Sequence, residues 1–183
     1  MKISRRRAGL AGSLLGLLCI GLFAGCNALA PSAAASGWSF AAFGDTPYSP
    51  TEDQALERMI AQLNREALPF VLHVGDFKGG VEPCSDALLK ERVAQLNRIR
   101  HAVIFVPGDN DWTDCDRASN GGYNSLERLD YERSVFFNTP YTLGQRTFRQ
   151  QVQATPLCMG FTGPAACVEN RRWIFPPLLG LLR

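Results

Sequence analysis

Apolar runs separated by amphipathic stretches divide the middle of the chain into strand–helix–strand units. The runs Trp38–Phe43, Phe70–Val74 and Ala102–Val106 each lead into a Gly-Asp pair. Their apolar character is typical of parallel strands, and their spacing of about 30 residues is that of one strand–helix–strand unit. The pattern therefore predicts an α/β fold with three parallel strands.

Helix-start signals lie between these runs. Ser49–Glu52 combines a capping-box Ser/Glu pair with a proline at the first helical position, which predicts a helix from there to about Ala67. Ser85 can cap a second helix, and a third is expected at about Ser125–Phe137. The apolar positions that support the first two helices are Leu56, Met59, Ile60, Leu63, Leu88, Val93, Leu96 and Ile99.

Three aspartates follow the predicted strands at nearly even spacing. Asp45, Asp76 and Asp109 lie 31 and 33 residues apart. Parallel strands bring their carboxyl ends to one edge of a sheet, where α/β folds place their ligands. Carboxylates that converge without partners are unfavourable, so this arrangement implies a bound cation.

The order Gly-Asp, Gly-Asp, Val-Pro-Gly-Asp-Asn-Asp resembles the calcineurin-like metallophosphoesterase superfamily, in a divergent bacterial branch. The resemblance covers about residues 38–137. It implies a metallophosphoesterase-like α/β sandwich of two sheets, of which only the first βαβαβ half is clearly present.

The resemblance also implies roles for five residues. Asp45 takes the first metal-ligand position and Asp76 the metal-bridging position, while Asp109 stands in place of a ligand asparagine. Asn110 falls where the family has its catalytic histidine, and Asp111 matches the acid that orients that histidine.

Other positions depart from the family pattern. Pro47 stands where the first motif has a histidine, and Lys78 follows the second Gly-Asp, where it could meet a phosphate. The family completes its metal site with histidines from the second half of the fold. The two histidines here, His73 and His101, lie in or beside a predicted buried strand and are expected to be structural.

The function that the resemblance implies is an exported, metal-dependent phosphoesterase, which hydrolyses small-molecule phosphate mono- or diesters through a metal-activated water. Two divalent ions are expected, Mn²⁺, Mg²⁺ or Fe, with Zn²⁺ less favoured because the ligands are oxygen-rich. Tyr48 and Trp112 are candidates for walls of a substrate pocket, with packing as the alternative. The alternative function is a non-catalytic exported binding protein on a decayed or truncated phosphoesterase scaffold.

The first 26 residues predict a signal peptide, because a basic start is followed by the uncharged apolar run Ala8–Gly25. The preceding residues make Cys26 the lipidation site of a bacterial lipoprotein signal. Cleavage near Ala30 or Ala35, or an uncleaved membrane anchor, are the alternatives. The expected location is periplasmic or membrane-anchored, with membrane contact only through the signal or a lipid anchor.

Residues 27–37, rich in alanine and serine, are expected to be a linker, and residues 38–150 the metallophosphoesterase-like domain. Residues 151–183 form an atypical tail, which suggests a shortened or frame-shifted copy of a longer protein.

The net charge argues against nucleic-acid binding, and the cysteine content indicates disulfides. Four of the 19 basic residues but none of the 17 acidic ones lie in the signal, so the chain after the signal has a net charge of −2. It contains no basic patch of the kind that binds nucleic acid. Cys84, Cys115, Cys158 and Cys167 allow two disulfides in an exported chain. The preferred pairing is Cys84–Cys115, which would tie together the loops after the second and third strands, and Cys158–Cys167.

Overall fold

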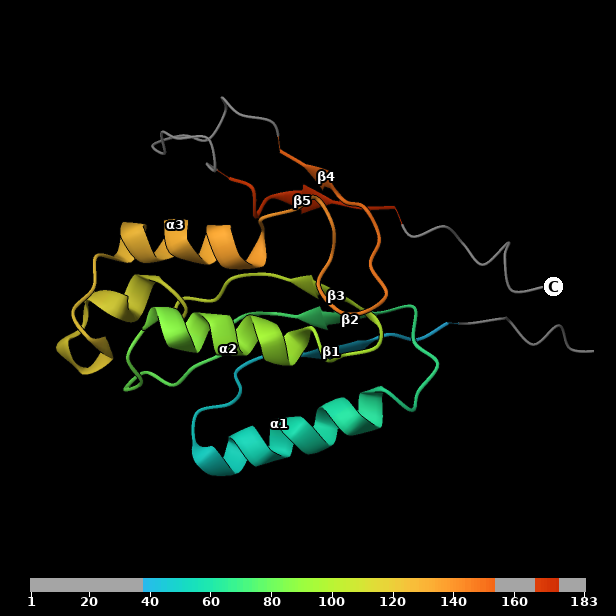
Figure 1. The fold of residues 1–183 in the computed structure, drawn as a ribbon, viewed down its shortest axis with the longest axis horizontal. Helices are drawn as coiled ribbons and strands as arrows, with labels where there is room; N and C mark the ends of the chain where they lie inside the picture. Colours follow the sequence, from blue (N-terminus) through green and yellow to red (C-terminus); the bar gives the residue numbers. More distant parts are fainter. Residues whose placement is uncertain (1–37, 154–166, 175–183) are drawn as a thin grey trace, which may run out of the picture. The chain divides into compact units, whose positions relative to one another are not determined.

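Three parallel strands form the sheet on which the fold is built. In the computed structural model, which describes residues 38–153 and 167–174, β1 (Ala41–Phe43), β2 (Phe70–His73) and β3 (Ala102–Phe105) pair in the order β1-β2-β3 (Figure 1). Helix α1 (Pro50–Leu63) joins β1 to β2, and α2 (Asp86–Leu96) joins β2 to β3. The predicted βαβαβ order is confirmed.

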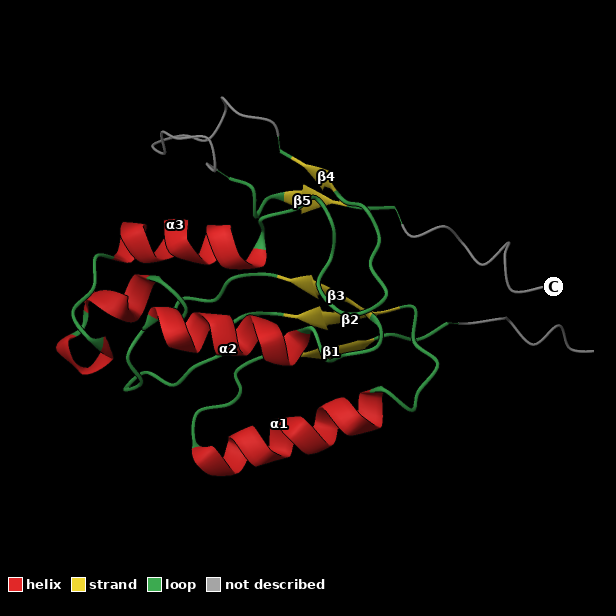
Figure 2. Cartoon of the chain, in the orientation of Figure 1, coloured by secondary structure: helices red, strands yellow, loops and turns green. Residues whose placement is uncertain are grey.

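The chain then continues through a polar loop into further elements. Two 3₁₀ turns, Thr113–Asp116 and Ala118–Asn120, precede α3 (Ser125–Phe136). A small antiparallel pair follows, β4 (Gln151–Val152) with β5 (Arg171–Arg172) (Figure 2). The sequence pattern indicated no strand after β3, because strands of two residues have no alternation to detect.

Both predicted helix-start signals are confirmed. The Ser49 hydroxyl accepts the N–H of Glu52 at 3.3 Å, and the Glu52 carboxylate accepts the N–H of Tyr48 at 2.7 Å. The Ser85 hydroxyl accepts the N–H of Leu88 at 3.2 Å. These bonds satisfy amides at helix starts that have no partner within the helix.

The predicted end of the first helix at Ala67 is wrong, because α1 ends at Leu63. The next residue, Asn64, donates from its side chain to the carbonyl of Arg98 at 3.0 Å and accepts the N–H of Arg100 at 2.6 Å. This contact with the segment before β3 fixes Asn64 at the end of the helix.

The two faces of the sheet pack differently. On one face, Val71, Val103 and Phe105 contact buried side chains from all three helices; these include Leu56, Ile60, Leu89, Leu96 and Phe136. On the other face, Phe70, Ala102 and Ile104 pack against Phe148 and Trp173. At the carboxyl ends of β2 and β3, Val74 and Val106 are 48% and 47% exposed.

Several sequence-based predictions concern residues outside the described ranges. They are the signal, the lipidation site Cys26, the linker at 27–37, Cys158 and most of the tail. Among the residues that are described, no helix has the length and apolar character needed to cross a membrane.

One side chain of the helix layer is a buried acid without a hydrogen bond among the described residues. Glu132 on α3 is fully buried, and neither of its carboxylate oxygens has a partner. Burial raises its pKa well above the usual value; the carboxylates of Asp111 and Glu169 raise it further, while Arg133 opposes them. The folded protein therefore favours the protonated form of Glu132.

We expect the free energy of unfolding to contain a term from Glu132 that falls as the pH rises above about 4.5. The folded state holds this proton more tightly than the unfolded chain, so raising the pH draws the equilibrium toward the unfolded state. Glu132→Gln should remove that term, so its stability relative to wild type should increase with pH. Urea unfolding between pH 5 and pH 8 measures the difference, with the exposed Glu66→Gln as the control. Parallel wild-type and Glu132→Gln profiles would contradict it.

Candidate functional site

The carboxyl ends of the three strands meet at one edge of the sheet. Beyond the strands the ladder continues: the N–H of Val74 donates to Phe43 at 2.9 Å and that of Asp45 to Gly75 at 3.1 Å. On the other side, the N–H of Val106 donates to His73 at 3.0 Å. The loops after β1, β2 and β3 are therefore adjacent, and each carries one of the three aspartates within its first four residues.

The backbone turns sharply at two of these aspartates. Asp45 and Asp76 have positive φ angles of 54° and 56°, which side-chain-bearing residues rarely adopt. The glycines beside them allow close approach of the loops. A Cβ at Gly108 would overlap Oδ1 of Asp76, and one at Gly44 would lie 2.5 Å from the Val74 side chain. Strain of this kind gathers at functional sites.

The carboxylate of Asp76 interacts with the negative charges of both Asp45 and Asp109. Asp45 and Asp109 are exposed, whereas Asp76 is half-buried. Partial burial is the main cause that raises the pKa of Asp76, and the carboxylates of Asp109 and Asp45 raise it further. The N–H of Asn110, which donates to Asp76 Oδ1 at 3.1 Å, acts in the opposite direction. The edge therefore carries mutually repelling negative charge.

The buried carboxylate of Asp111 holds two of the loops together. Its oxygens accept the N–H groups of Asp76 and Phe77 at 2.9 Å each and that of Gly108 at 2.8 Å. Burial raises the pKa of Asp111 to about 6, and these three donors limit the rise. Asp111, which the resemblance matches to the acid that orients a catalytic histidine, thus bonds to the backbone of the loops after β2 and β3. A catalytic role for Asp111 stays a proposal.

Tyr48 connects the first loop to the third. Its hydroxyl lies 3.4 Å from Oδ1 of Asp45, and the Asn110 side-chain amide donates to it at 3.4 Å. Partial burial first, then Asp76, raises the pKa of Tyr48 to about 12. The hydroxyl is thus a protonated group at an edge made of carboxylates.

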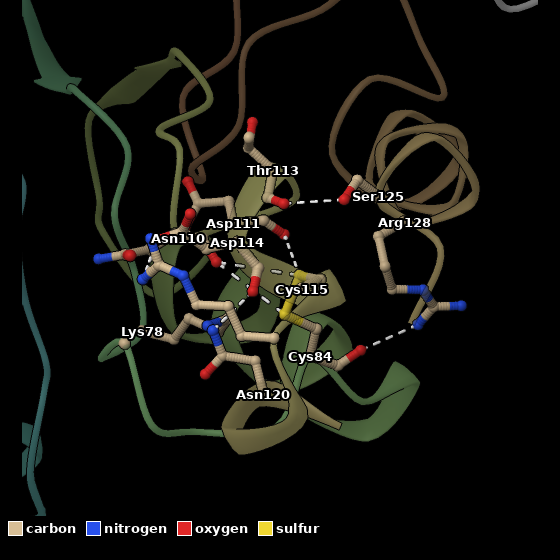
Figure 3. Close-up of a disulfide and its surroundings, with 12 residues drawn as sticks. Lys78, Cys84, Asn110, Asp111, Thr113, Asp114, Cys115, Asn120, Ser125 and Arg128 are labelled. Atoms are coloured by element: carbon tan, nitrogen blue, oxygen red, sulfur yellow. Dashed lines mark hydrogen bonds and ion pairs between the residues drawn. A yellow bond between two sulfur atoms is a disulfide. The ribbon is translucent and has the colours of Figure 1, made fainter. Parts of the chain in front are cut away.

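A disulfide connects two of the segments that surround the site. Cys84 and Cys115 are bonded, which is the preferred pairing from the sequence, and they tie the loop after β2 to the first 3₁₀ turn (Figure 3). Ser125 and Arg128 of α3 reach the same region: the Ser125 hydroxyl donates to Thr113 at 2.8 Å and Arg128 donates to the Cys84 carbonyl at 3.0 Å.

The two cations near the edge are already engaged. Lys78 is fully buried beside the disulfide (Figure 3), and its Nζ donates to the Gly79 carbonyl at 3.1 Å. Burial lowers the pKa of Lys78. In this structure Lys78 is closed off from solvent, so a phosphate contact by Lys78 stays a prediction. Arg117 pairs with the buried Asp114 at 2.6 Å.

Both histidines occupy structural positions. The ring of His73 packs between Phe43 and Phe105, and its Nδ1 accepts the N–H of Gly75 at 3.1 Å. Burial lowers its pKa to about 4, so the ring is neutral at physiological pH. The buried His101 lies 3.0 Å from the Leu63 carbonyl through Nε2. These contacts agree with the structural roles expected for them.

The donor set at the edge fits a hard divalent cation in its chemistry. Asp45, Asp76 and Asp109 offer carboxylate oxygens, which Mg²⁺ and Mn²⁺ prefer. Burial is the main cause that raises the pKa of Asp76, and a cation would relieve the repulsion from Asp109 and Asp45 that adds to it. Within residues 38–153 and 167–174, however, no three His, Cys, Asp or Glu side chains form a ready-made ligand group. Cation binding by all three carboxylates therefore requires a side-chain arrangement different from the one in this structure.

Searches against protein families, curated proteins and solved structures find no match to this chain.

Two features of the edge went beyond what the sequence indicated. Tyr48 was a candidate pocket wall, but its contact with Asn110 spans 62 residues of sequence and leaves no local signal. The burial of Asp111 was also missed, because it lies in a segment dense in Asp, Asn and Thr that is typical of a solvated loop.

We expect Asp111→Ala to destabilise the protein by about 3 kcal/mol or more, because three backbone donors lose their acceptor in a buried position. Urea unfolding at pH 8, where wild-type Asp111 is ionised, measures the change. Asp116→Ala, which removes an exposed carboxylate from the same segment, is the matched control and should change stability by less than about 0.5 kcal/mol. Equal effects of the two substitutions would contradict the bracing role of Asp111.

Proposed function

We propose that this protein is an exported, metal-dependent phosphoesterase that hydrolyses small-molecule phosphate mono- or diesters. The observation that carries the proposal is the edge where Asp45, Asp76 and Asp109 follow three adjacent parallel strands. Burial first, and then the charges of Asp109 and Asp45, raise the pKa of Asp76 there. The motif resemblance to calcineurin-like metallophosphoesterases supports the same reading. On this proposal, the βαβαβ unit is the first half of that family's two-sheet sandwich.

The residues of the edge would have different roles in this function. Asp45, Asp76 and Asp109 would hold the metal, and the central position of Asp76 suits it to contact two ions. A divalent ion bound there supplies positive charge to the phosphate and lowers the pKa of water toward neutrality. The side chain of Asn110, which lies beside Tyr48 at this edge, would orient the phosphate group. The oxygen donors favour Mn²⁺ or Mg²⁺ over Zn²⁺.

One observation favours a second candidate, a non-catalytic exported binding protein on the same scaffold. The sequence contains two histidines, and both are buried in structural contacts. Asn110, where the family has its catalytic histidine, cannot transfer a proton as an imidazole does. Such a protein would bind a cation or a phosphate at the edge without turnover.

Export is supported by one feature of the described residues. The disulfide between Cys84 and Cys115 is compatible with an oxidising compartment. Together with the predicted signal, this supports a periplasmic or membrane-anchored location.

We expect Mn²⁺ to bind the wild-type protein and to switch on hydrolysis of aryl phosphate monoesters and diesters. Asp76→Asn should reduce that activity by about 100-fold or more, because it removes the central charge that holds the cation. It should remain folded, since its amide oxygen can still accept the N–H of Asn110. Calorimetric titration with Mn²⁺ and an assay for the released aryl alcohol, which both ester classes produce, measure the two effects, and Asp116→Asn is the control.

Three outcomes separate the candidates. Activity that requires both Mn²⁺ and Asp76 supports the phosphoesterase. Binding of Mn²⁺ that is lost in Asp76→Asn, with no hydrolysis by the wild type, supports the binding protein. Binding that Asp76→Asn leaves unchanged rejects the proposed site in both cases.

A further inference from the structure

The backbone of Tyr48 is fixed on two sides at the candidate site. It follows Pro47 and precedes Ser49, which caps α1, and its N–H donates to the Glu52 carboxylate at 2.7 Å. The loop after β2 lies against it, because a Cβ added to Gly79 would be 3.4 Å from the Cβ and the carbonyl oxygen of Tyr48. The phenol ring therefore projects from an anchored position between the start of α1 and the β2 loop.

The hydroxyl of Tyr48 lies among the site residues. It is 3.4 Å from Asp45 Oδ1 and 3.4 Å from the side-chain nitrogen of Asn110. Tyr48 thus touches the loop after β1 and the loop after β3 with its hydroxyl, and the loop after β2 with its backbone. The side chain remains 39% exposed, so a molecule bound at the edge can reach it.

The described side chains at this edge of the sheet offer many hydrogen-bond acceptors and few hydrogen-bond donors. Carboxylates accept hydrogen bonds and donate none, whereas a phenol can donate one. Lys78 and Arg117, the nearby cations, bond to Gly79 and Asp114. Among the described side chains at the edge, the Tyr48 hydroxyl donates to Asp45 Oδ1 and the Asn110 amide donates to Tyr48, each at 3.4 Å. These two hydrogen bonds are long, so a substrate oxygen at the edge can replace either acceptor.

Phosphate-ester hydrolysis places a demand on such a donor. As the bond from phosphorus to the ester oxygen breaks, that oxygen gains negative charge and then takes a proton from solvent, while water supplies the new oxygen on phosphorus. A hydrogen bond that strengthens as this charge develops lowers the barrier. The demand is greatest for esters whose leaving alcohol is a weak acid.

We propose that Tyr48 is a catalytic residue that donates a hydrogen bond from its hydroxyl to the leaving-group oxygen of the phosphate ester. This inference rests on the proposed phosphoesterase function. It names a donor for the reaction at a site where the family's histidine is replaced by Asn110. The role fits esters of weakly acidic alcohols, whose leaving oxygen needs this stabilisation most.

The test compares wild type, Tyr48→Phe and Tyr141→Phe with Mn²⁺ present. Tyr141 is a suitable control, because it is 47% exposed and lies outside the three strand-end loops. The substrates are phenyl phosphate, whose leaving group is a weak acid, and 2,4-dinitrophenyl phosphate, whose leaving group is a much stronger acid. We expect Tyr48→Phe to lower kcat by about 100-fold for phenyl phosphate and by less than about threefold for the dinitrophenyl ester, whose leaving oxygen needs little stabilisation. Mn²⁺ affinity should stay unchanged, and Tyr141→Phe should match wild type.

Equal losses on both substrates would overturn the proposal, because a structural or positioning defect does not distinguish leaving groups. Unchanged kcat in Tyr48→Phe would also overturn it while leaving the proposed function intact. Wild-type protein that binds Mn²⁺ but hydrolyses neither ester would reject the phosphoesterase function, and the Tyr48 proposal with it.

Discussion

The geometry of the candidate site depends on one buried interaction, in which the Asp111 carboxylate accepts three backbone N–H groups. Two of the donors belong to the turn after β2 and one to the turn after β3. A buried carboxylate is costly unless hydrogen bonds satisfy it, and here the donors come from the segment that presents Asp76. The distance between Asp76 and Asn110, which share a hydrogen bond of 3.1 Å, is therefore set by a residue that is itself inaccessible.

Local strain and packing around this interaction reinforce it. Asp45 and Asp76 hold positive φ angles, and the close approach at Gly108 leaves no room for a side chain. His73 bonds to the N–H of Gly75 from the core, and its ring is fixed between two phenylalanines. The hydrophobic core thus reaches the turn directly, which links the stability of the sheet to the arrangement of the edge.

The sequence predicted those parts of the fold that depend on local signals. The strand order and the caps at Ser49 and Ser85 follow from apolar runs and from hydroxyl residues at helix starts. The end of α1 could not be predicted from such local signals, because Asn64 is held by Arg98 and Arg100, more than thirty residues away. The same holds at the site: the three aspartates were visible as a pattern, whereas the bracing by Asp111 and the bridge by Tyr48 exist only once three loops meet.

The charge balance at the edge gives the cation proposal its physical basis. Asp45, Asp76 and Asp109 repel one another enough to raise the pKa of Asp76, although burial contributes more. The nearby Lys78 is directed at a backbone carbonyl, and Arg117 neutralises Asp114. With the cations of the surrounding described residues engaged in this way, compensation for the edge has to come from solvent. Protons can supply it only at acidic pH, whereas a divalent cation can supply it at neutral pH.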